Sequence, residues 1–337
     1  MRPFFACNEP GPLLDRMRAA GIECRSVPMR NPYDIAAARN LAKICEELRI
    51  DIIHTNYLRE NYIAIFAKLI LRKGLKIIYT NHFVTPVKLP VKIMNGILTR
   101  LDHRIISVCE AGVPRLLANG NAKSKIIVVH NAVDPSDWRP GVDYGEIRAR
   151  ARRELNIGAD EKVFLCASRF AHDKGHKFLI DSVKYLKDRY GVDKMKILLA
   201  GDGPLESDIK MRVESAGLAG VIRFLGFTPD IKPLFYASDV YLNPSQHEAL
   251  SFLIIEALAS GLPVIAADMG GNREIVNDRH NCGILVEYGD AEAYGEAIQA
   301  LRTNDLLMEE KKSNAIPTVE RHFSLEDMLA KTFASFY

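Results

Sequence analysis

The segment at residues 239–274 constrains the fold of this chain more than any other stretch. Its pattern predicts an apolar strand at 239–242, a polar loop at 243–249, an apolar helix at about 250–260 and a second strand at 263–267. A strand–helix–strand unit of this kind places the loop and the first helical turn at the carboxyl end of a parallel sheet, where α/β proteins bind ligands. The amino end of the helix also offers unpaired N–H groups and a partial positive charge, which suit a phosphate.

Two carboxylates bracket the start of this helix, Glu248 and Glu256. Glu256 is the only charged residue between Ser251 and Ser260, in a segment otherwise built of Phe, Leu, Ile and Ala. Such a helix is buried, and a lone buried carboxylate is costly unless a partner satisfies it. A sugar hydroxyl or a ribose is one such partner. The alternative is that Glu256 lies at the edge of the core and meets water or a backbone N–H.

Strands and helices alternate along the whole chain, which predicts an α/β protein with doubly wound parallel sheets. The alternation breaks at residues 130–141, which are rich in Asn, Asp, Pro and Gly, and it resumes after an arginine-rich helix at 147–155. At 337 residues the chain is long enough for two such domains.

Composition excludes several classes of protein. Hydrophobic content of 48% and charged content of 26% are those of an ordinary soluble enzyme. A net charge of +3 is too weak to indicate a nucleic-acid partner, although it fits anionic substrates or an anionic membrane surface. The six cysteines are scattered, Met1 opens no signal peptide and no apolar run is long enough to span a membrane. We therefore expect a cytoplasmic protein with reduced thiols.

Polar residues follow three predicted strands in the second half of the chain. Arg169 and Lys174 come after the strand at 163–168, Gly-Asp-Gly-Pro at 201–204 follows the next strand, and Glu248 follows a third. Because parallel strands place these loops along one edge, two cations and a set of N–H groups are expected to face one cleft. Such groups stabilise a departing nucleoside diphosphate as its charge grows. Taken singly, an arginine after a strand is usually a surface residue and Gly-Asp-Gly-Pro a tight turn.

The conjunction of these motifs resembles a known family. Glu248, seven residues and Glu256, followed by ALASGLPVIAADMGGNREIV, resemble the signature of the retaining family-four glycosyltransferases, group 1 glycosyl transferases of GT-B fold. The preceding Ser-Arg…Lys-Gly and Gly-Asp-Gly-Pro motifs occur in the family's order. The resemblance implies two Rossmann-like doubly wound domains facing across a cleft. These are an acceptor-side domain at 1–138, to which a C-terminal helix at 322–337 returns, and a nucleotide-sugar-binding domain at 139–321.

The resemblance also implies roles for individual residues. Arg169 and Lys174 would hold the diphosphate, Glu248 would accept hydrogen bonds from donor-sugar hydroxyls, and Glu256 would accept them from the ribose diol. The family often has Gly-Phe-Gly after the first glutamate, whereas Ala-Leu-Ser stands here, and this departure leaves the donor sugar open. Substrate-binding groups are further expected at the helix start, in the Gly-Asp-Gly-Pro turn and in the segment that holds the base, namely Ala249, Leu250, Ser251, Phe252, Gly201, Gly203, Gly226 and Phe227.

The first domain should supply the acceptor side. His82 ends a predicted strand and resembles the family's histidine near the transferred sugar, the alternative being a satisfied histidine at a strand end. His54 resembles the first histidine of a family motif whose second histidine is Asn56 here, and we expect His54 to be structural. Glu110 and Asn131 match family positions at the cleft rim and between the domains, and both are expected to be structural.

The helix predicted within residues 87–101 has an apolar face and a basic face. The basic side chains suit an interfacial helix that touches anionic lipid or a lipid-linked acceptor, and the alternative is a helix packed on the core with a solvated face. The apolar residues are Ile93, Met94, Ile97, Leu98 and Leu101, and the basic ones Lys88, Lys92 and Arg100.

These observations predict a retaining, metal-independent hexosyltransferase of polysaccharide or lipopolysaccharide synthesis. Its donor would be a UDP-sugar, with a GDP-sugar next in order, and its acceptor a glycan or lipid-linked glycan. No Asp-x-Asp pair occurs, so neither a metal nor a cofactor is expected, and Asp290-Ala291-Glu292 is expected to cap a helix. The alternatives are a nucleotide-sugar-binding protein that no longer catalyses and a UDP-sugar epimerase of GT-B fold.

One departure from the family concerns the first strand. Family members open with a strand, a Gly-rich loop and a long helix ahead of the strand that residues 3–7 resemble, and this sequence has no counterpart of that unit. We expect either that another segment takes its place or that a sheet edge is exposed, with impaired activity unless the unit is supplied.

Overall fold

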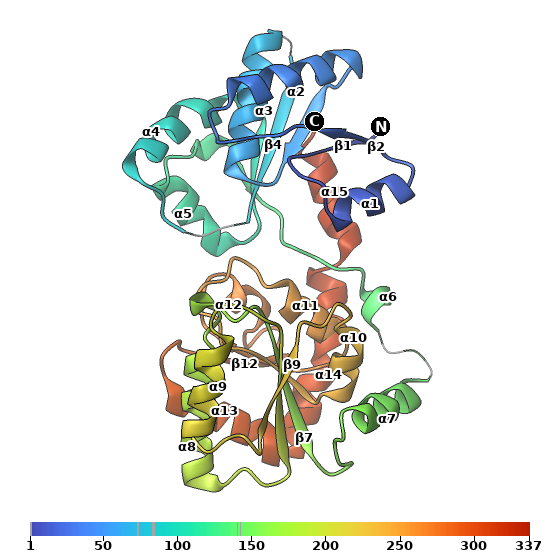
Figure 1. Cartoon of the computed structure of the whole chain (residues 1–337), viewed down its shortest axis with the longest axis vertical. Coiled ribbons are helices and arrows are strands. Elements are labelled where there is room, and N and C mark those ends of the chain that lie inside the picture. Colours follow the sequence, from blue (N-terminus) through green and yellow to red (C-terminus); the bar gives the residue numbers. More distant parts are fainter. Residues whose placement is uncertain (1, 73, 83–84, 140, 142) are drawn as a thin grey trace. The chain divides into compact units, whose positions relative to one another are not determined.

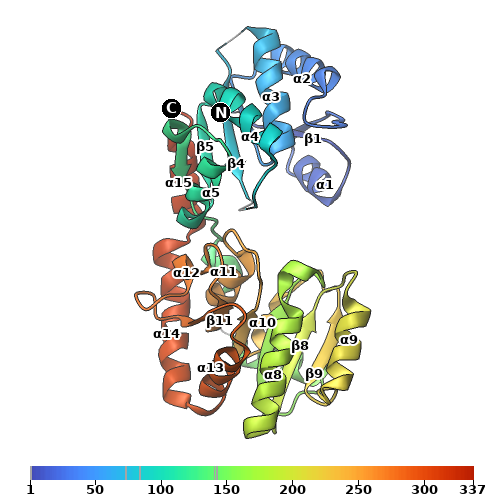
Figure 2. The ribbon, with the colours of Figure 1, turned by 90° about the vertical axis from the view of Figure 1, so that its left-hand side faces the viewer.

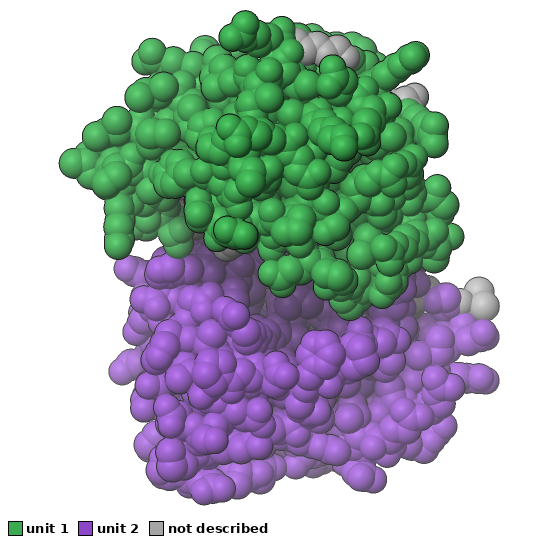
Figure 3. Space-filling model, turned by 45° about the horizontal axis from the view of Figure 1, so that its top comes forward, with its two compact units in different colours: residues 1–108, 113–129, 332–337 green, residues 109–112, 130–331 purple. Residues whose placement is uncertain are grey.

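The computed structural model describes residues 2–72, 74–82, 85–139, 141 and 143–337, which form two compact units (Figure 3). Unit 1 comprises residues 1–108, 113–129 and 332–337, and unit 2 comprises residues 109–112 and 130–331. The chain therefore passes from one unit to the other at 108/109, 112/113, 129/130 and 331/332. The predicted domain boundary after residue 138 stays a prediction.

Unit 1 is an α/β unit whose parallel strands form two sheets. One sheet has the order β1-β2 and the other the order β3-β4-β5-β6, so the single sheet expected for this domain is divided. The strands are β1 Phe4–Cys7, β2 Glu23–Ser26, β3 Ile52–Thr55, β4 Lys76–Asn81, β5 Arg104–Ser107 and β6 Ile126–Val128. The helices are α1 Pro12–Ala19, α2 Ile35–Glu47, α3 Leu58–Leu71, α4 Leu89–Leu98 and α5 Val113–Ala118, with 3₁₀ turns η1 Thr99–Leu101 and η3 Lys123–Lys125.

The core of unit 1 lies between α3 and the four-stranded sheet. Helix α3 carries a nearly continuous apolar run, and Tyr62, Ile63 and Ile65 are at most 1% exposed. The run packs against the buried centre of β4, where Ile77 is fully buried. A helix that is apolar on most of its surface is expected in such a position.

Unit 2 contains a six-stranded parallel sheet of order β12-β11-β10-β7-β8-β9 (Figures 1 and 2). The strands are β7 Lys162–Ala167, β8 Met195–Ala200, β9 Ile222–Gly226, β10 Val240–Asn243, β11 Val264–Ala267 and β12 Gly283–Val286. The helices are α6 Pro135–Trp138, α7 Tyr144–Glu154, α8 His176–Tyr190, α9 Glu206–Ser215, α10 Lys232–Ala237, α11 Phe252–Ala259, α12 Asn272–Ile275, α13 Ala291–Thr303, α14 Asp305–His322 and α15 Leu325–Ala334. The 3₁₀ turns are η2 Glu110–Gly112 and η4 His172–Lys174, and the last residues of α15 belong to unit 1.

Helices cover both faces of this sheet. On one face α8, α9 and α13 share a single apolar cluster with alternate strand residues, including Val240 and Leu242. Tyr241 between them points to the other face, where its ring lies 5.8 Å from that of Phe235 on α10. Strands β10 and β11 are buried throughout, as expected for apolar strands in the middle of a parallel sheet.

The strand order brings four loops to one edge of this sheet. Strands β10, β7, β8 and β9 are neighbours and run parallel, so the loops that follow their carboxyl ends lie side by side. These loops contain every candidate site residue predicted in the second domain except three. Phe252 and Glu256 lie on α11, and Gly226 is the last residue of β9. The edge of the sheet therefore positions the candidate site.

Candidate functional site

Glycines pack the loops after β7 and β8 against each other. Phe170 N donates to Asp202 O at 2.6 Å, and Gly201 N donates to Gly226 O at 2.8 Å. A Cβ on Gly201 would lie 2.1 Å from Ser168 O, and one on Gly203 2.6 Å from Phe170 O. The predicted glycines therefore allow close backbone approach, which fixes the loop that carries Arg169.

The two predicted cations have different surroundings. Lys174 Nζ lies 2.9 Å from Glu248 Oε1 and 3.7 Å from Asp173 Oδ2, whereas Arg169 is exposed and its side chain has no polar partner among the described residues. Gly175 has φ +69°, and a Cβ there would lie 1.8 Å from Pro244 O, so the turn with Lys174 lies directly on the loop with Glu248. The structure thus brings Lys174 and Glu248 together as an ion pair.

Free backbone N–H groups stand at the start of α11. Ser251 caps the helix by accepting from Ile254 N, while Ala249 O accepts from Gly271 N at 2.7 Å and Leu250 O accepts from Asn131 Nδ2 at 2.9 Å. In a trans peptide the N–H of the next residue points opposite to the carbonyl, so these two contacts turn the N–H groups of Leu250 and Ser251 away from their scaffold. Within the described residues, the backbone N–H groups of Ala249, Leu250, Ser251 and Phe252 donate no hydrogen bond.

Glu256 is a half-buried carboxylate on α11 without a hydrogen-bond partner among the described residues. Burial raises the pKa of Glu256 to about 7. Burial also raises the pKa of Tyr241, and electrostatic interactions with Cys166, Glu248 and Glu256 act in the same direction. The carboxylate of Glu256 is therefore available to a ligand hydroxyl.

Two aromatic rings of the predicted site are exposed. Phe227, after Gly226 with its φ of +71°, is 71% exposed, and Phe252 is 45% exposed. Large apolar rings at a ligand-binding edge can stack on a planar base or on the apolar face of a sugar.

In unit 1, His82 follows β4 and contacts the end of β3. Its Nε2 lies 3.2 Å from Asn56 Oδ1, and the centroid of its ring 6.1 Å from that of Tyr57. Burial lowers the pKa of His82, which favours the neutral imidazole. His54 pairs with Thr80 Oγ1 at 2.7 Å, in line with a structural role.

Helix α4 presents a different apolar face from the predicted one. Leu98 is buried, and Met94 and Leu101 pack against the core. Ile93 and Ile97 are 57% and 60% exposed, and the third exposed residue of the stripe is Leu89, at 68%. The predicted apolar face is therefore wrong as a single surface, because the helix divides its apolar residues between core and solvent.

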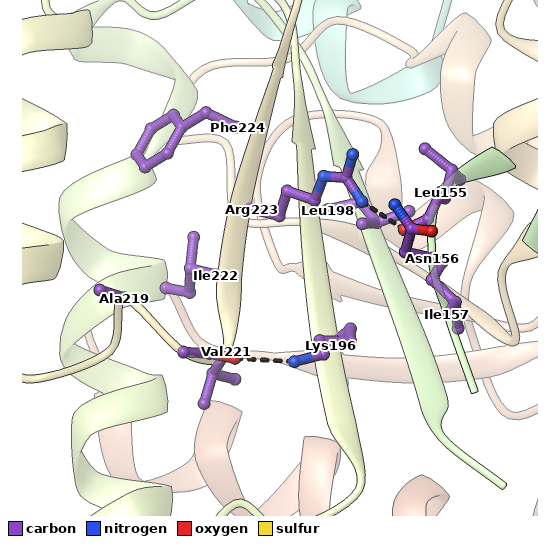
Figure 4. Close-up of a pocket in the computed structure, with 11 residues that line it drawn as sticks. Leu155, Asn156, Ile157, Lys196, Leu198, Ala219, Val221, Ile222, Arg223 and Phe224 are labelled. Carbon is purple, nitrogen blue, oxygen red and sulfur yellow. Dashed lines mark hydrogen bonds between the residues drawn. The ribbon is translucent and has the colours of Figure 1, made fainter. Parts of the chain in front are cut away.

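A cavity of about 380 Å³ lies elsewhere in unit 2 (Figure 4). It is lined by residues at the starts of β8 and β9 and the end of α7, away from the carboxyl ends of the strands. Its two cations are occupied, because Lys196 Nζ donates to Gly220 O at 2.8 Å and Arg223 donates to Leu155 O. Each cation is thus held by a backbone carbonyl, and the cavity lies apart from the residues predicted to bind a ligand.

Two residues of the site region escaped the sequence analysis. His176 Nε2 lies 3.3 Å from Ser168 Oγ, and its ring centroid lies 4.5 Å from that of Phe170. Burial lowers the pKa of His176 to about 4, so the ring is neutral. Glu274, on α12, accepts hydrogen bonds from the N–H groups of Glu110 and Ala111.

Comparison with known proteins decides the family. A family model described as "Glycosyl transferases group 1" matches residues 147–318, just over half of the chain, and one described as "Glycosyltransferase Family 4" matches residues 3–137. The chain belongs to the group 1 glycosyl transferases. The predicted family and enzyme class are thereby confirmed.

Individual relatives match this glycosyltransferase over more than half of its length. A UDP-Gal:alpha-D-GlcNAc-diphosphoundecaprenol alpha-1,3-galactosyltransferase of Escherichia coli is 23% identical over 326 residues, 89% of this chain and 80% of the relative. The lipopolysaccharide core biosynthesis glycosyltransferase LpsE of Rhizobium meliloti is 31% identical over 182 residues, 54% of this chain and 52% of the relative.

The fold of this glycosyltransferase also matches solved structures. The crystal structure of Anabaena Alr3699/HepE in complex with UDP superposes with a TM-score of 0.86 at 20% identity, covering 98% of this chain and 91% of that chain. The predicted α/β fold of GT-B type, with two Rossmann-like domains, is confirmed by such neighbours.

Two further kinds of site are absent among the described residues. None of their helices combines the length and the apolar character that a membrane span requires. The described residues also include no group of three or more His, Cys, Asp or Glu placed to hold a metal ion.

Proposed function

We propose that this glycosyltransferase moves a hexosyl group from a UDP-sugar to a glycan or lipid-linked acceptor of the cell envelope. The observation that carries the proposal is the row of free N–H groups at residues 249–252, next to the Lys174–Glu248 pair. N–H groups at a helix start together with a lysine form an anion site suited to a diphosphate. The UDP complex of the HepE structure and the UDP-Gal donor named for the Escherichia coli relative favour UDP over GDP.

The residues divide the chemistry between them. Lys174, Arg169 and the free N–H groups stabilise the negative charge that develops on the departing diphosphate, and this gives a metal-independent route. Glu248, held by Lys174, accepts hydrogen bonds from sugar hydroxyls, and Glu256 accepts them from the ribose. His82 serves the acceptor side. The resemblance to the family signature supports transfer with retention of configuration at the anomeric carbon.

A thermal-shift screen against UDP, GDP, ADP and their sugars tests the donor, because a ligand that binds only the folded state raises the melting temperature. Incubation with radiolabelled UDP-sugars then tests transfer, and NMR of the product gives the anomeric configuration. We expect the largest shift with UDP compounds and a product of retained configuration. Binding without turnover would make the chain a nucleotide-sugar-binding protein, and an altered sugar still joined to UDP would make it an epimerase.

We also propose that α4 contacts an anionic membrane surface on the cytoplasmic side. Leu89, Ile93 and Ile97 follow one another at helical spacing and are each more than half exposed, and the flanking cations Lys88 and Arg100 are exposed as well. Apolar insertion combined with basic side chains favours anionic lipid. Sedimentation with vesicles of anionic and of zwitterionic lipid tests this: Ile93→Ser with Ile97→Ser should abolish binding to anionic vesicles, and equal binding of both proteins would refute the contact.

A further inference from the structure

The Glu274 carboxylate joins three separate segments of unit 2. Its Oε1 accepts from Ala111 N at 2.8 Å, and its Oε2 accepts from Glu110 N at 2.9 Å. Nε2 of His130 lies 2.8 Å from the same Oε2. The side chain of Glu274 is only 16% exposed, so the carboxylate is shielded and its oxygen atoms are occupied by these donors.

The loop with the free N–H groups is contacted by the segment that precedes Glu274 and by the segment of His130, and the segment of Glu110 and Ala111 packs against the former. Gly270 and Gly271 precede its helix α12, and a Cβ on Gly270 would lie 1.7 Å from Glu248 O. Gly271 N donates to Ala249 O, and a Cβ on Gly271 would lie 2.9 Å from Cys109 Cβ. Asn131, which follows His130, donates to Leu250 O. Three successive carbonyls, at residues 248–250, thus rest on a scaffold that Glu274 ties together.

We propose that Glu274 and His130 are positioning residues that set the direction of the N–H groups offered to the diphosphate. The scaffold engages the carbonyls of Glu248, Ala249 and Leu250, and the planar peptides turn the following N–H groups to the opposite side. A neutral amide in place of the Glu274 carboxylate cannot accept from both backbone N–H groups and His130, because one of its two atoms is a donor. The scaffold then loosens, and the N–H groups lose their common direction. This inference rests on the proposed function, since the diphosphate is its ligand.

The test compares Glu274→Gln and His130→Gln with the unchanged protein. Amide hydrogen exchange should become faster at Glu110, Ala111 and Gly271 in Glu274→Gln, a result that does not depend on any ligand. Affinity for UDP should fall about tenfold, the scale of one lost charge-assisted hydrogen bond, while affinity for uridine, which has no phosphate, stays the same. Glu274→Asp, which keeps the charge, should restore part of the UDP affinity.

A matched control is Glu214→Gln, which removes an exposed carboxylate of α9 whose side chain makes no hydrogen bond or ion pair among the described residues. It should leave exchange and both affinities unchanged. Equal losses of UDP and uridine affinity in Glu274→Gln, or unaltered exchange at residues 110, 111 and 271, would overturn the positioning role. If the unchanged protein binds no UDP while Glu274→Gln still accelerates exchange, the proposed function fails and the scaffold stands, so the two failures are distinguishable.

Discussion

At the scale of single residues, Glu256 is a half-buried carboxylate whose charged form is destabilised by burial. Burial raises its pKa from 4.5 to about 7, so the folded protein binds the proton more tightly than the unfolded chain does. The free energy of unfolding therefore falls as the pH rises from about 4.5 to 7, and the full cost of burying the charged form is present above that range. The unliganded enzyme thus holds destabilising charge where the ribose is proposed to bind.

The variant Glu256→Gln should therefore be more stable than the unchanged protein in alkaline solution. We expect a gain of about 1–3 kcal/mol at pH ~8, shrinking to nothing near pH ~4, from denaturant titrations at both values. An equal difference at both pH values would mean that the charge of Glu256 carries no penalty.

Affinity for UDP should rise with pH over the range in which the stability of the unliganded protein falls. A ribose diol donates to the charged carboxylate, so UDP binding lowers the pKa of Glu256 and releases a proton below pH ~7. We expect calorimetry to show UDP affinity rising with pH through this region in the unchanged protein and a flatter, weaker profile in Glu256→Gln. Superimposable profiles would remove Glu256 from the ribose site.

Sequence reasoning located these residues unevenly. Lys174, Glu248 and Glu256 could be chosen as candidates because each lies within a short, spaced motif next to a strand or helix end, and their roles stay predictions. Glu274 could not, because its partners lie 144 to 164 positions away in the chain, and no local pattern reports a contact of that range. His176 was missed for a related reason. The sequence marks it only as the start of a helix, and its contact with Ser168 depends on how the turn at His172–Lys174 folds back.

At the scale of elements, the loop at 248–252 depends on a glycine that admits no side chain. Gly270 has φ +55°, and any Cβ there would meet Glu248 O at 1.7 Å. Gly289 offers a matched comparison, because it has φ +98° with nothing within 4 Å of a Cβ.

We expect Gly289→Ala to lose about 1 kcal/mol of stability through the unfavourable φ, and Gly270→Ala to lose more, because its Cβ also clashes with Glu248 O. Only Gly270→Ala should also weaken UDP binding, by tenfold or more on the scale of displaced hydrogen bonds to a charged ligand, because its loop must move. Urea unfolding measures the stability of both variants, and calorimetry measures their UDP affinity. Equal UDP affinity of the two variants would show that the loop at 248–252 does not contribute to phosphate binding.

The elements themselves were largely predictable. Helix α11 was expected at about 250–260 and spans Phe252–Ala259, and Asp290 caps α13 as expected, by accepting from Ala293 N. The division of apolar residues on α4 was not predictable, because Ile93 and Leu98 are equally apolar and only the packing of neighbouring segments decides which is covered.

At the scale of the whole molecule, the two sheets of unit 1 differ in how much structure supports them. Within the described part of the chain, β1 and β2 pair only with each other, whereas β7 and β8 lie inside a six-stranded sheet. A sheet of two strands is marginal by itself, and the backbone groups on its outer edges lack strand partners. The alternation of strands and helices was predicted, but periodicity contains no information on which strands pair, so the division into two sheets could not be predicted.

Amide hydrogen exchange should reveal this difference directly. We expect β1 and β2 to exchange through local opening, at least about tenfold faster than β7 and β8, which open only with unit 2 as a whole. Equal protection of the four strands would show that the small sheet is supported by more than its own pairing.

The path of the chain has a consequence for anyone who dissects this enzyme. Because the backbone passes between the units at four places, neither unit corresponds to one continuous gene fragment. A fragment encoding residues 130–331 would omit residues 109–112, whose amide groups the Glu274 carboxylate binds. In such a fragment the Glu274 carboxylate would lack two of its hydrogen-bond donors, next to the loop that we propose to bind the diphosphate. The fragment's affinity for UDP would therefore understate that of the intact protein.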